Sequence, residues 1–229
     1  MKIALVLRSG GDYDVSDVQW LVNQLPVGYE VLCFTDCQHA RVPGVTFIPF
    51  IHRWYDCRGW WAKLELFRPD VEDDLFYIDL DTVITGDICP ILESLSPDFT
   101  MLRDFFHPQY LMSSVMWIPN KDKEQIWSVF FTDRAGWINR CVTTECWGDQ
   151  GFIRKVMGDR TPVFNDIYPG WFKSYKADIV KPGTRYATSR YSRGNGSLPE
   201  DCRVVIFHGN PRPRRVQEVW IPGTQGYAE

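Results

Sequence analysis

Two aspartates, Asp79 and Asp81, directly follow an apolar run from Leu75 to Ile78. The run is typical of a buried β-strand, and alternation along an extended chain would place both carboxylates on one side of its end. Two neighbouring carboxylates need a counter-charge, which a hard divalent cation, Mn²⁺ or Mg²⁺, shared with the phosphates of a ligand would supply. An isolated Asp-x-Asp is more often a solvated strand end. The preceding strand favours a binding site here, because open α/β sheets hold ligands at the carboxyl ends of their strands.

A late apolar strand at 203–207 ends in a second polar group, which contains His208, Gly209 and Arg212. Histidine is scarce, with four in the chain, and of these His208 stands at a strand exit beside a glycine. A lone histidine is usually structural, although a neutral imidazole is also a good third ligand for Mn²⁺ beside two carboxylates. Both interpretations of His208 remain open at this point.

The first fifty residues predict the sheet that would position these groups. Strand patterns at 2–7, 30–35 and 45–50 alternate with an amphipathic helix at 15–25, which is βαβ patterning and indicates parallel strands with right-handed crossovers. A nucleotide would lie over the carboxyl ends of these strands, near Arg8, Ser9 and Asp36. The fold class predicted is therefore α/β, with a mainly parallel mixed sheet flanked by helices.

The rest of the chain predicts further helices and strands, with two ambiguous residues. Lys63, in a predicted helix at 56–68, either reaches the site or is exposed. Asp149 either caps a helix at 150–157 or belongs to the site. A helix at 121–131 has Asn120 as its expected N-cap, and the stretch 159–202 is expected to be mostly irregular. Other elements are predicted at 89–95 (helix), 99–103 (strand) and 113–118 (strand).

Length and composition are those of an ordinary globular protein. With 229 residues, 45% of them hydrophobic, we expect a single domain over 1–229, divided into a nucleotide-binding part at 1–90, an acceptor and sugar part with the closing histidine strand at 91–213, and a C-terminal tail at 214–229. Neither a secretory signal nor a transmembrane stretch is evident, so we expect a cytoplasmic protein. The seven cysteines lack Cys-x-x-Cys spacing and indicate reduced thiols.

Motifs and charge exclude some functions. The chain lacks both the Gly-x-Gly-x-x-Gly dinucleotide fingerprint and the Gly-Lys-Ser/Thr phosphate loop. The net charge is −4, but residues 171–229 carry 10 basic and 5 acidic side chains. This asymmetry is a weak indication that the C-terminal quarter meets an anion such as a phosphate.

Three motifs together, in order and spacing, resemble the glycosyltransferases of family 8 type, the glycogenin and galactosyltransferase group, and most closely their short bacterial and phage forms. They are Asp79-Leu80-Asp81, Gly148-Asp149-Gln150-Gly151 and His208-Gly209-Asn210-Pro211-Arg212-Pro213. The resemblance implies a GT-A fold, a nucleotide-sugar donor, usually a UDP-sugar, and Mn²⁺ held by Asp-x-Asp and a late histidine. It would make Asp79, Asp81 and His208 the metal ligands, with Leu80 and Gly209 beside the donor.

The resemblance also implies roles for other residues. The family's late motif is His-Phe-x-Gly-x-x-Lys-Pro, whose lysine contacts the diphosphate, and Arg212 would take that place in the shorter segment here. Ser113-Ser114-Val115 looks like the family's Asn-Ser-Gly-Val segment of the sugar pocket, so Ser114 is expected at the donor. Lys63 matches the family's basic residue before the Asp-x-Asp strand.

Transfer of a sugar leaves negative charge on a diphosphate and an oxocarbenium-like sugar. Asp149, Gln150 and Asp104 are the candidates for the face of that sugar. The resemblance implies retention of anomeric configuration, without a clear covalent nucleophile.

Competing functions remain. Asp79-Leu80-Asp81-Thr82-Val83 also fits the haloacid-dehalogenase-like phosphatases, with Asp79 as nucleophile. A carbohydrate-binding protein without turnover is a second alternative, since the ten tryptophans could stack on sugars. The acceptor is expected to be a glycan, and the basic C-terminal region leaves room for modified-base DNA.

Overall fold

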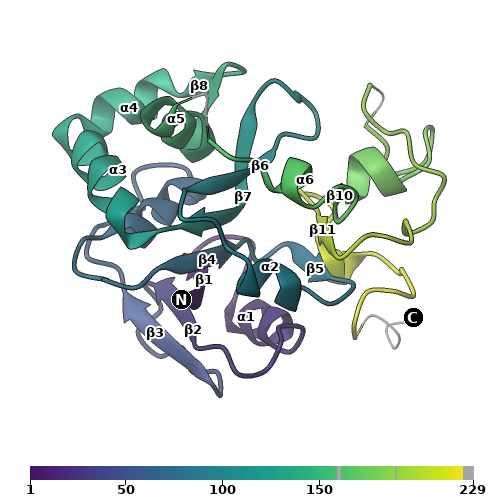
Figure 1. Cartoon of the computed structure of the whole chain (residues 1–229), viewed down its shortest axis with the longest axis horizontal. Coiled ribbons are helices and arrows are strands. Elements are labelled where there is room, and N and C mark those ends of the chain that lie inside the picture. Colours follow the sequence, from purple (N-terminus) through teal and green to yellow (C-terminus); the bar gives the residue numbers. More distant parts are fainter. Residues whose placement is uncertain (159–160, 189, 224–229) are drawn as a thin grey trace.

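The computed structural model describes residues 1–158, 161–188 and 190–223, and a six-stranded mixed sheet runs through it (Figure 1). The strand order is β3-β2-β1-β4-β7-β6. The first four strands of that order are parallel, β7 is antiparallel to β4, and β6 is antiparallel to β7. The predicted mainly parallel mixed sheet is confirmed. Its strands are β1 (Lys2–Leu7), β2 (Val31–Thr35), β3 (Val45–Pro49), β4 (Leu75–Ile78), β6 (Thr100–Arg103) and β7 (Leu111–Ile118).

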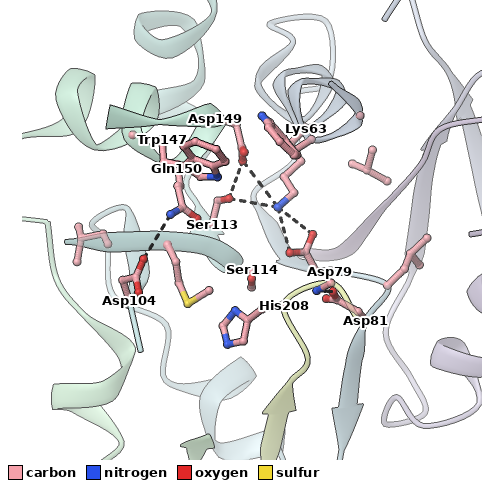
Figure 2. Close-up of a pocket in the computed structure, with 18 of the residues that line it drawn as sticks. Lys63, Asp79, Asp81, Asp104, Ser113, Ser114, Trp147, Asp149, Gln150 and His208 are labelled. Carbon is pink, nitrogen blue, oxygen red and sulfur yellow. Dashed lines mark hydrogen bonds and ion pairs between the residues drawn. The ribbon is translucent and has the colours of Figure 1, made fainter. Parts of the chain in front are cut away.

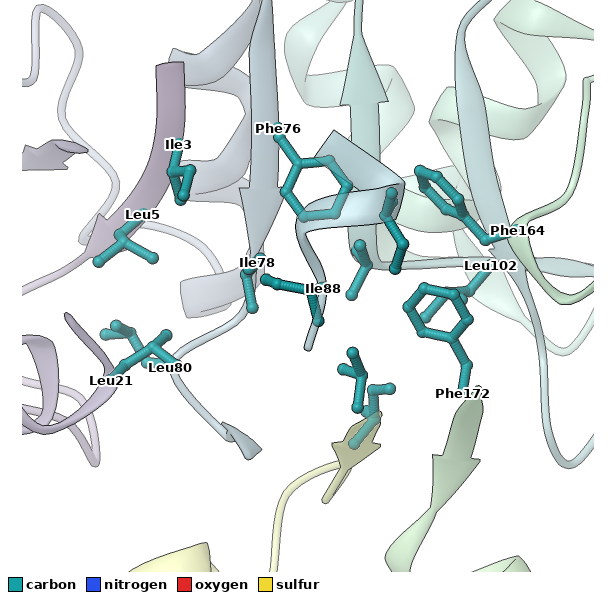
Figure 3. Close-up of a cluster of buried hydrophobic side chains, with 14 of the residues drawn as sticks. Ile3, Leu5, Leu21, Phe76, Ile78, Leu80, Ile88, Leu102, Phe164 and Phe172 are labelled. Atoms are coloured by element: carbon teal, nitrogen blue, oxygen red, sulfur yellow. The ribbon is translucent and has the colours of Figure 1, made fainter. Parts of the chain in front are cut away.

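Helices cover both faces of this sheet because its strands are apolar on both sides. Ile3 and Leu5 of β1 pack into one core cluster, and Ala4 between them packs into the other. The first cluster, shown in Figure 3, includes α1 (Val15–Val22), α2 (Cys89–Glu93) and α6 (Phe164–Ile167). The second includes the 3₁₀ helix η1 (Gly59–Phe67), α3 (Asn120–Thr132), α4 (Arg134–Arg140) and α5 (Gly148–Met157).

A second sheet of three short strands lies beside the first, with the order β10-β11-β5. It consists of β5 (Thr82–Ile84), β10 (Phe172–Ser174) and β11 (Val204–Ile206), followed in the chain by the short 3₁₀ helix η3 (Pro213–Arg215). Residues of β5 and β11 pack with Tyr175 and Ile179 of the π-helix η2 (Tyr175–Ile179) and with Val216 and Ile221 in a third core cluster. Since β4 belongs to the first sheet and β5 to the second, Asp79-Leu80-Asp81 is the link between the two sheets.

Several local predictions are corrected by the structure. The N-cap of α3 is Pro119, and the Asn120 prediction was wrong, since its backbone N–H instead donates to the Asp74 carboxylate at 2.7 Å. The stretch expected to be irregular contains α6, β10 and η2, although residues 159, 160 and 189 of it lie outside the described residues. Helix α4 and the hairpin of β8 (Val142–Thr143) and β9 (Cys146–Trp147) were not predicted.

Two further observations concern the ends of the chain and membranes. In the segment expected to be a C-terminal tail, Val216 and Ile221 are buried in the third cluster, and residues 224–229 lie outside the described residues. Among the helices of the described ranges, none has the length and apolar character needed to cross a membrane.

Candidate functional site

The strand directions bring the predicted site residues to one edge of the main sheet. Strands β1, β4 and β6 all end at this edge, where they deliver Arg8, Asp79 and Asp104. Because β7 runs the opposite way, its first half lies at the same edge. A cavity of about 730 Å³ opens there. Its lining includes these predicted residues: Arg8, Lys63, Asp79, Leu80, Asp81, Asp104, Ser113, Ser114, Asp149, Gln150, His208, Gly209 and Arg212.

Two residues predicted for the nucleotide are absent from the lining of this cavity. Ser9 donates to the carboxylate of Asp36 through its backbone N–H, at 2.7 Å, and through its hydroxyl, at 2.8 Å. Asp36 is thereby engaged in joining the loop after β1 to the loop after β2. Arg8 does line the cavity, and its guanidinium donates to the carbonyl oxygens of Trp54 and Cys57.

Lys63 is the centre of a buried polar network, drawn in Figure 2. Its Nζ lies 2.9 and 3.0 Å from the two carboxylate oxygens of Asp79, and 3.7 Å from a carboxylate oxygen of Asp149. The hydroxyl of Ser113 accepts from Lys63 at 3.2 Å and donates to Asp149 at 2.6 Å. The 3₁₀ helix η1 thus places Lys63 inside the site, where it neutralises part of the charge of two carboxylates.

Burial and charge set the protonation of this network. Burial raises the pKa of Asp79 and of Asp149, while the Lys63 ammonium opposes that shift at both. Burial lowers the pKa of Lys63, but the carboxylates of Asp149 and Asp79 outweigh it, and the net shift is upward. Lys63 is therefore held as an ammonium, while two buried carboxylates compete for it.

Asp149 is not the N-cap of helix α5. That position is taken by Trp147, and Asp149 lies in the first turn with its carboxylate on Ser113 and near Lys63. The alternative that Asp149 belongs to the site fits these contacts. A carboxylate in the first turn also suits the positive end of the helix dipole.

Asp81 differs from Asp79 in its partners. One carboxylate oxygen, Oδ2, accepts from the Gly209 N–H at 3.1 Å and lies 3.2 Å from the Arg212 guanidinium. The other oxygen, Oδ1, is buried and has no hydrogen-bond partner within the described part of the chain. Arg212 also contacts the carboxylate of Asp12 at 2.5 Å and the hydroxyl of Tyr13.

His208 follows strand β11 and turns sharply into the cavity. Its φ is +51°, a left-handed conformation that is uncommon outside glycine, and Phe105 and Phe106 pack against its ring at centroid distances of 5.4 and 5.3 Å. Lys176 holds the turn by donating to the His208 carbonyl at 2.6 Å. Burial, with Lys176 and Lys63 nearby, lowers the pKa of His208 to about 3. The imidazole is thus neutral, and its buried Nε2 has no partner among the residues described.

Asp104 and Gln150 lie together on the wall opposite. Asp104 accepts from the backbone N–H groups of Phe106 and His107 at 2.7 and 2.9 Å, which fixes one carboxylate oxygen. Its other oxygen is 3.5 Å from the Gln150 amide nitrogen. This weak contact leaves the Gln150 amide and one Asp104 oxygen able to turn toward a ligand.

The three predicted metal ligands lie at one cavity with unequal numbers of partners. Asp79, Asp81 and His208 line one cavity, but within the described ranges no group of three or more His, Cys, Asp or Glu side chains is arranged to hold a metal ion. One predicted ligand, Asp79, is paired with Lys63. The orphaned Asp81 Oδ1 and His208 Nε2 are a carboxylate oxygen and a neutral imidazole nitrogen, the donor types that suit Mn²⁺.

Sequence reasoning missed several residues of the cavity. Asp12 and Tyr13, a few residues after the predicted Arg8 and Ser9, contact Arg212. Trp60, Tyr110 and Trp147 also line the cavity. Position provided a signal for Trp147, which directly precedes the Gly-Asp-Gln-Gly motif. For Tyr13 the sequence offers no comparable signal, because only the fold brings it to Arg212.

No family model matches the chain, and no curated protein does. Solved structures of similar fold exist. Galactosyltransferase LgtC in complex with donor and acceptor sugar analogues superposes with a TM-score of 0.61 at 13% identity, over 98% of this chain and 92% of that one. The apo form of the glycosyltransferase GlyE from Streptococcus pneumoniae TIGR4 gives 0.60 at 15% identity, over 96% and 58%. The bifunctional glycosyltransferase WbbM gives 0.55 at 12%, over 93% and 46%. The chain therefore has a GT-A-like glycosyltransferase fold.

Proposed function

We propose that this protein is a metal-dependent glycosyltransferase that moves a sugar from a nucleotide-sugar donor, a UDP-sugar, to an acceptor. One observation carries the proposal. Asp81 Oδ1 and His208 Nε2 are buried atoms without hydrogen-bond partners in the described ranges, and their residues line the same cavity as the cations Lys63 and Arg212. Unpaired buried polar atoms are costly, so their presence in a cavity favours a ligand that completes them.

Asp81 and His208 would hold a Mn²⁺ or Mg²⁺ ion, with Asp79 as the third ligand. A bound cation would stabilise the negative charge that develops on the departing diphosphate. Since the chain offers few donor atoms here, the diphosphate oxygens complete the coordination. Metal and nucleotide are therefore expected to bind together.

Arg212 and Lys63 supply the remaining positive charge. The Arg212 guanidinium, already in the cavity through Asp81 and Asp12, would donate to a diphosphate oxygen. Lys63 lies between Asp79 and Asp149, so it would link the metal side of the site to the sugar side. Such preplaced cations stabilise the leaving group without reorganisation.

The donor sugar would be faced by four polar residues: Asp149, Gln150, Asp104 and Ser114. Their carboxylate, amide and hydroxyl groups can accept from or donate to sugar hydroxyls, and a carboxylate or amide also stabilises the oxocarbenium-like sugar. We propose retention of configuration, as the resemblance implies. Because Asp149 is hydrogen-bonded to Ser113 and approached by Lys63, it would stabilise the oxocarbenium-like sugar by its charge and would not form a covalent bond to it.

The rival functions have less support. A phosphatase would need Asp79 as a nucleophile, but both oxygens of its carboxylate lie within 3.0 Å of Lys63 Nζ. Modified-base DNA as acceptor depended on free arginines in the C-terminal region. Several of these are engaged: Arg193 contacts Asp178, Arg212 contacts Asp12 and Asp81, and Arg214 contacts Asp17. We therefore propose a glycan acceptor.

The proposal is tested by calorimetric titration of UDP into the protein with Mn²⁺ and with EDTA. We expect UDP affinity to fall at least tenfold in EDTA, because the diphosphate oxygens of UDP would be ligands of the metal. The variant His208→Ala should need a higher Mn²⁺ concentration for UDP binding and keep nearly the same melting temperature without metal, since its Nε2 makes no hydrogen bond within the described residues. Equal UDP affinity with and without the metal would exclude this site as a metal site.

A matched control for this variant is His107→Ala. His107 also lines the cavity, but its Nε2 is engaged, 3.3 Å from the Tyr191 hydroxyl. The variant His107→Ala should leave the Mn²⁺ requirement unchanged.

A second measurement separates an enzyme from a carbohydrate-binding protein without turnover. Only an enzyme would release free UDP from UDP-sugars in the presence of an acceptor.

A further inference from the structure

Aromatic side chains also line the cavity, in addition to the groups discussed for the metal and the diphosphate. Trp147 lines the cavity from the hairpin of β8 and β9, and 47% of its surface is exposed. Trp60 and Tyr110 line the same cavity. An indole that is half exposed in a cavity, and not buried in the core, offers its face to a ligand.

The ring of Trp147 packs against the ring of Trp60. The ring centroids of Trp147 and Trp60 are 5.9 Å apart at an interplanar angle of 39°. Gly148 has a φ of +55°, and a Cβ at this position would lie 2.6 Å from Trp60 Nε1. Only glycine therefore allows Trp60 to pack this closely under the start of helix α5. The pair forms an aromatic platform at the cavity.

Polar groups surround this platform. Asp149 and Gln150 follow Trp147 at the start of α5, and Figure 2 shows the indole beside them. Arg154 also lines the cavity, and its guanidinium lies 4.7 Å from the Tyr110 ring and donates to the Glu145 carbonyl at 2.5 Å. An aromatic face with a polar rim matches a pyranose, which has a face of C–H bonds and hydroxyls around its edge.

We propose that Trp147, backed by Trp60, forms a subsite that stacks on a sugar ring of the acceptor, an inference that rests on the proposed glycosyltransferase function. In the proposed function the donor sugar is bonded directly to the diphosphate and would be faced by Asp149, Gln150 and Asp104, which line the cavity. Trp147 lies on the exposed hairpin at the rim, so the ring it holds is the next one, which enters from solvent.

The test uses Trp147→Ala and Trp147→Phe, with Val142→Ala as the control, since Val142 is exposed on the same hairpin and is absent from the cavity lining. Methyl glycosides of glucose, galactose and mannose, both anomers, are titrated into protein loaded with UDP and Mn²⁺ and followed by tryptophan fluorescence and by saturation-transfer NMR. We expect Trp147→Ala to weaken glycoside binding roughly tenfold or more, the size of a lost aromatic contact. Trp147→Phe should retain affinity within about threefold, and Val142→Ala should match the parent protein.

The outcomes separate this inference from the proposed function. If no glycoside binds the parent protein, or if Trp147→Ala binds glycosides normally, the subsite is wrong. If Trp147→Ala keeps glycoside affinity but loses affinity for UDP-glucose and UDP-galactose relative to UDP, the tryptophan serves the donor sugar and the acceptor assignment is overturned. Glycoside binding that depends on Trp147 in a protein unable to bind UDP and Mn²⁺ would support the subsite and refute the transferase.

Discussion

The two aspartates of the Asp-x-Asp motif have different partners in the structure. Asp79 is paired with Lys63, whereas Asp81 keeps one oxygen without a partner in the described structure. The two carboxylates of one motif thus have different roles before any ligand arrives. His208 is neutral for a physical reason, burial beside Lys176 and Lys63, which lowers its pKa to about 3. Protons are therefore not expected to compete for its Nε2 between pH 5 and 8.

Arg212 and Arg215 provide a test at this scale. Arg212 lines the cavity and contacts Asp81, while Arg215, three residues later, is exposed and absent from the cavity lining. Arg212→Ala should lower kcat/KM for transfer by about 10²-fold, the size expected for a group that stabilises a departing diphosphate. Arg215→Ala should change it less than threefold. A larger effect at Arg215 would show that Arg212 is not the residue that contacts the diphosphate.

At the residue scale, a position at or shortly after the end of a strand indicated which side chains reach the cavity. Asp79 and Asp104 directly follow β4 and β6, and Asp81 and His208 lie within three residues of a strand end; all four line the cavity, while their roles there stay predictions. Ser9 and Asp36 also follow strands, yet they bond to each other and are absent from the lining. The strand-end rule finds the edge of the sheet, but it cannot distinguish a side chain that faces a ligand from one that satisfies its neighbour.

At the scale of elements, the long apolar strands of the main sheet were predicted, whereas β5, β10 and the β8–β9 hairpin were not. Strands of the main sheet are apolar over four to eight residues, which is a clear signal. Strands β5 and β10 have three residues each, too few for a pattern. The helix predicted at 56–68 is a 3₁₀ helix at Gly59–Phe67, in which side chains three apart align, so Trp60, Lys63 and Leu66 lie in one row.

Helix α3 contains a buried lysine that makes a pH prediction. Lys123 is 1% exposed, and its Nζ donates to the carbonyl oxygens of Val71 and Asp73 at 2.7 and 2.6 Å. Burial lowers its pKa from 10.5 to about 8, although Asp73, Asp74 and Asp70 oppose the shift. Between these two pH values the folded protein has lost a proton that the unfolded chain still binds. The contribution of Lys123 to the free energy of unfolding should therefore increase as pH rises from 8 to 10.5. The protein loses this extra stability when the pH returns to 8.

The measurement is urea unfolding of the parent protein and Lys123→Met at pH 7.5, 9 and 10.5. The stability of the parent relative to the variant should rise with pH by an amount on the order of 3 kcal/mol at most. Lys121→Met is the control on the same helix, because Lys121 is 58% exposed and 3.5 Å from Asp98. A difference between the parent and Lys123→Met that does not change with pH would show that Lys123 keeps its ordinary pKa.

At the scale of the whole molecule, two sheets share one connection, and the site lies on it. The mainly parallel character of the main sheet could be predicted because its first three strands have clear apolar patterns and a helix lies between the first two. The second sheet could not, because β5 pairs with β11, and Val204 lies opposite Ile84. No local pattern specifies a partner more than a hundred residues away. The superposition on LgtC covers 98% of this chain, so a fold of this kind is already seen in a solved structure.

The pairing of β5 with β11 also has a consequence for synthesis of the protein. At translation rates of 5–20 residues per second, the ribosome needs roughly 6–24 s to proceed from Ile84 to Val204. Throughout that interval β5, with its buried Val83, has no partner strand, and His208 has not yet been made. The nascent chain therefore carries both aspartates long before it can bind a donor, and it exposes an unpaired strand edge during this time. An unpaired strand edge of this kind is a template for pairing with other chains until β11 has been made.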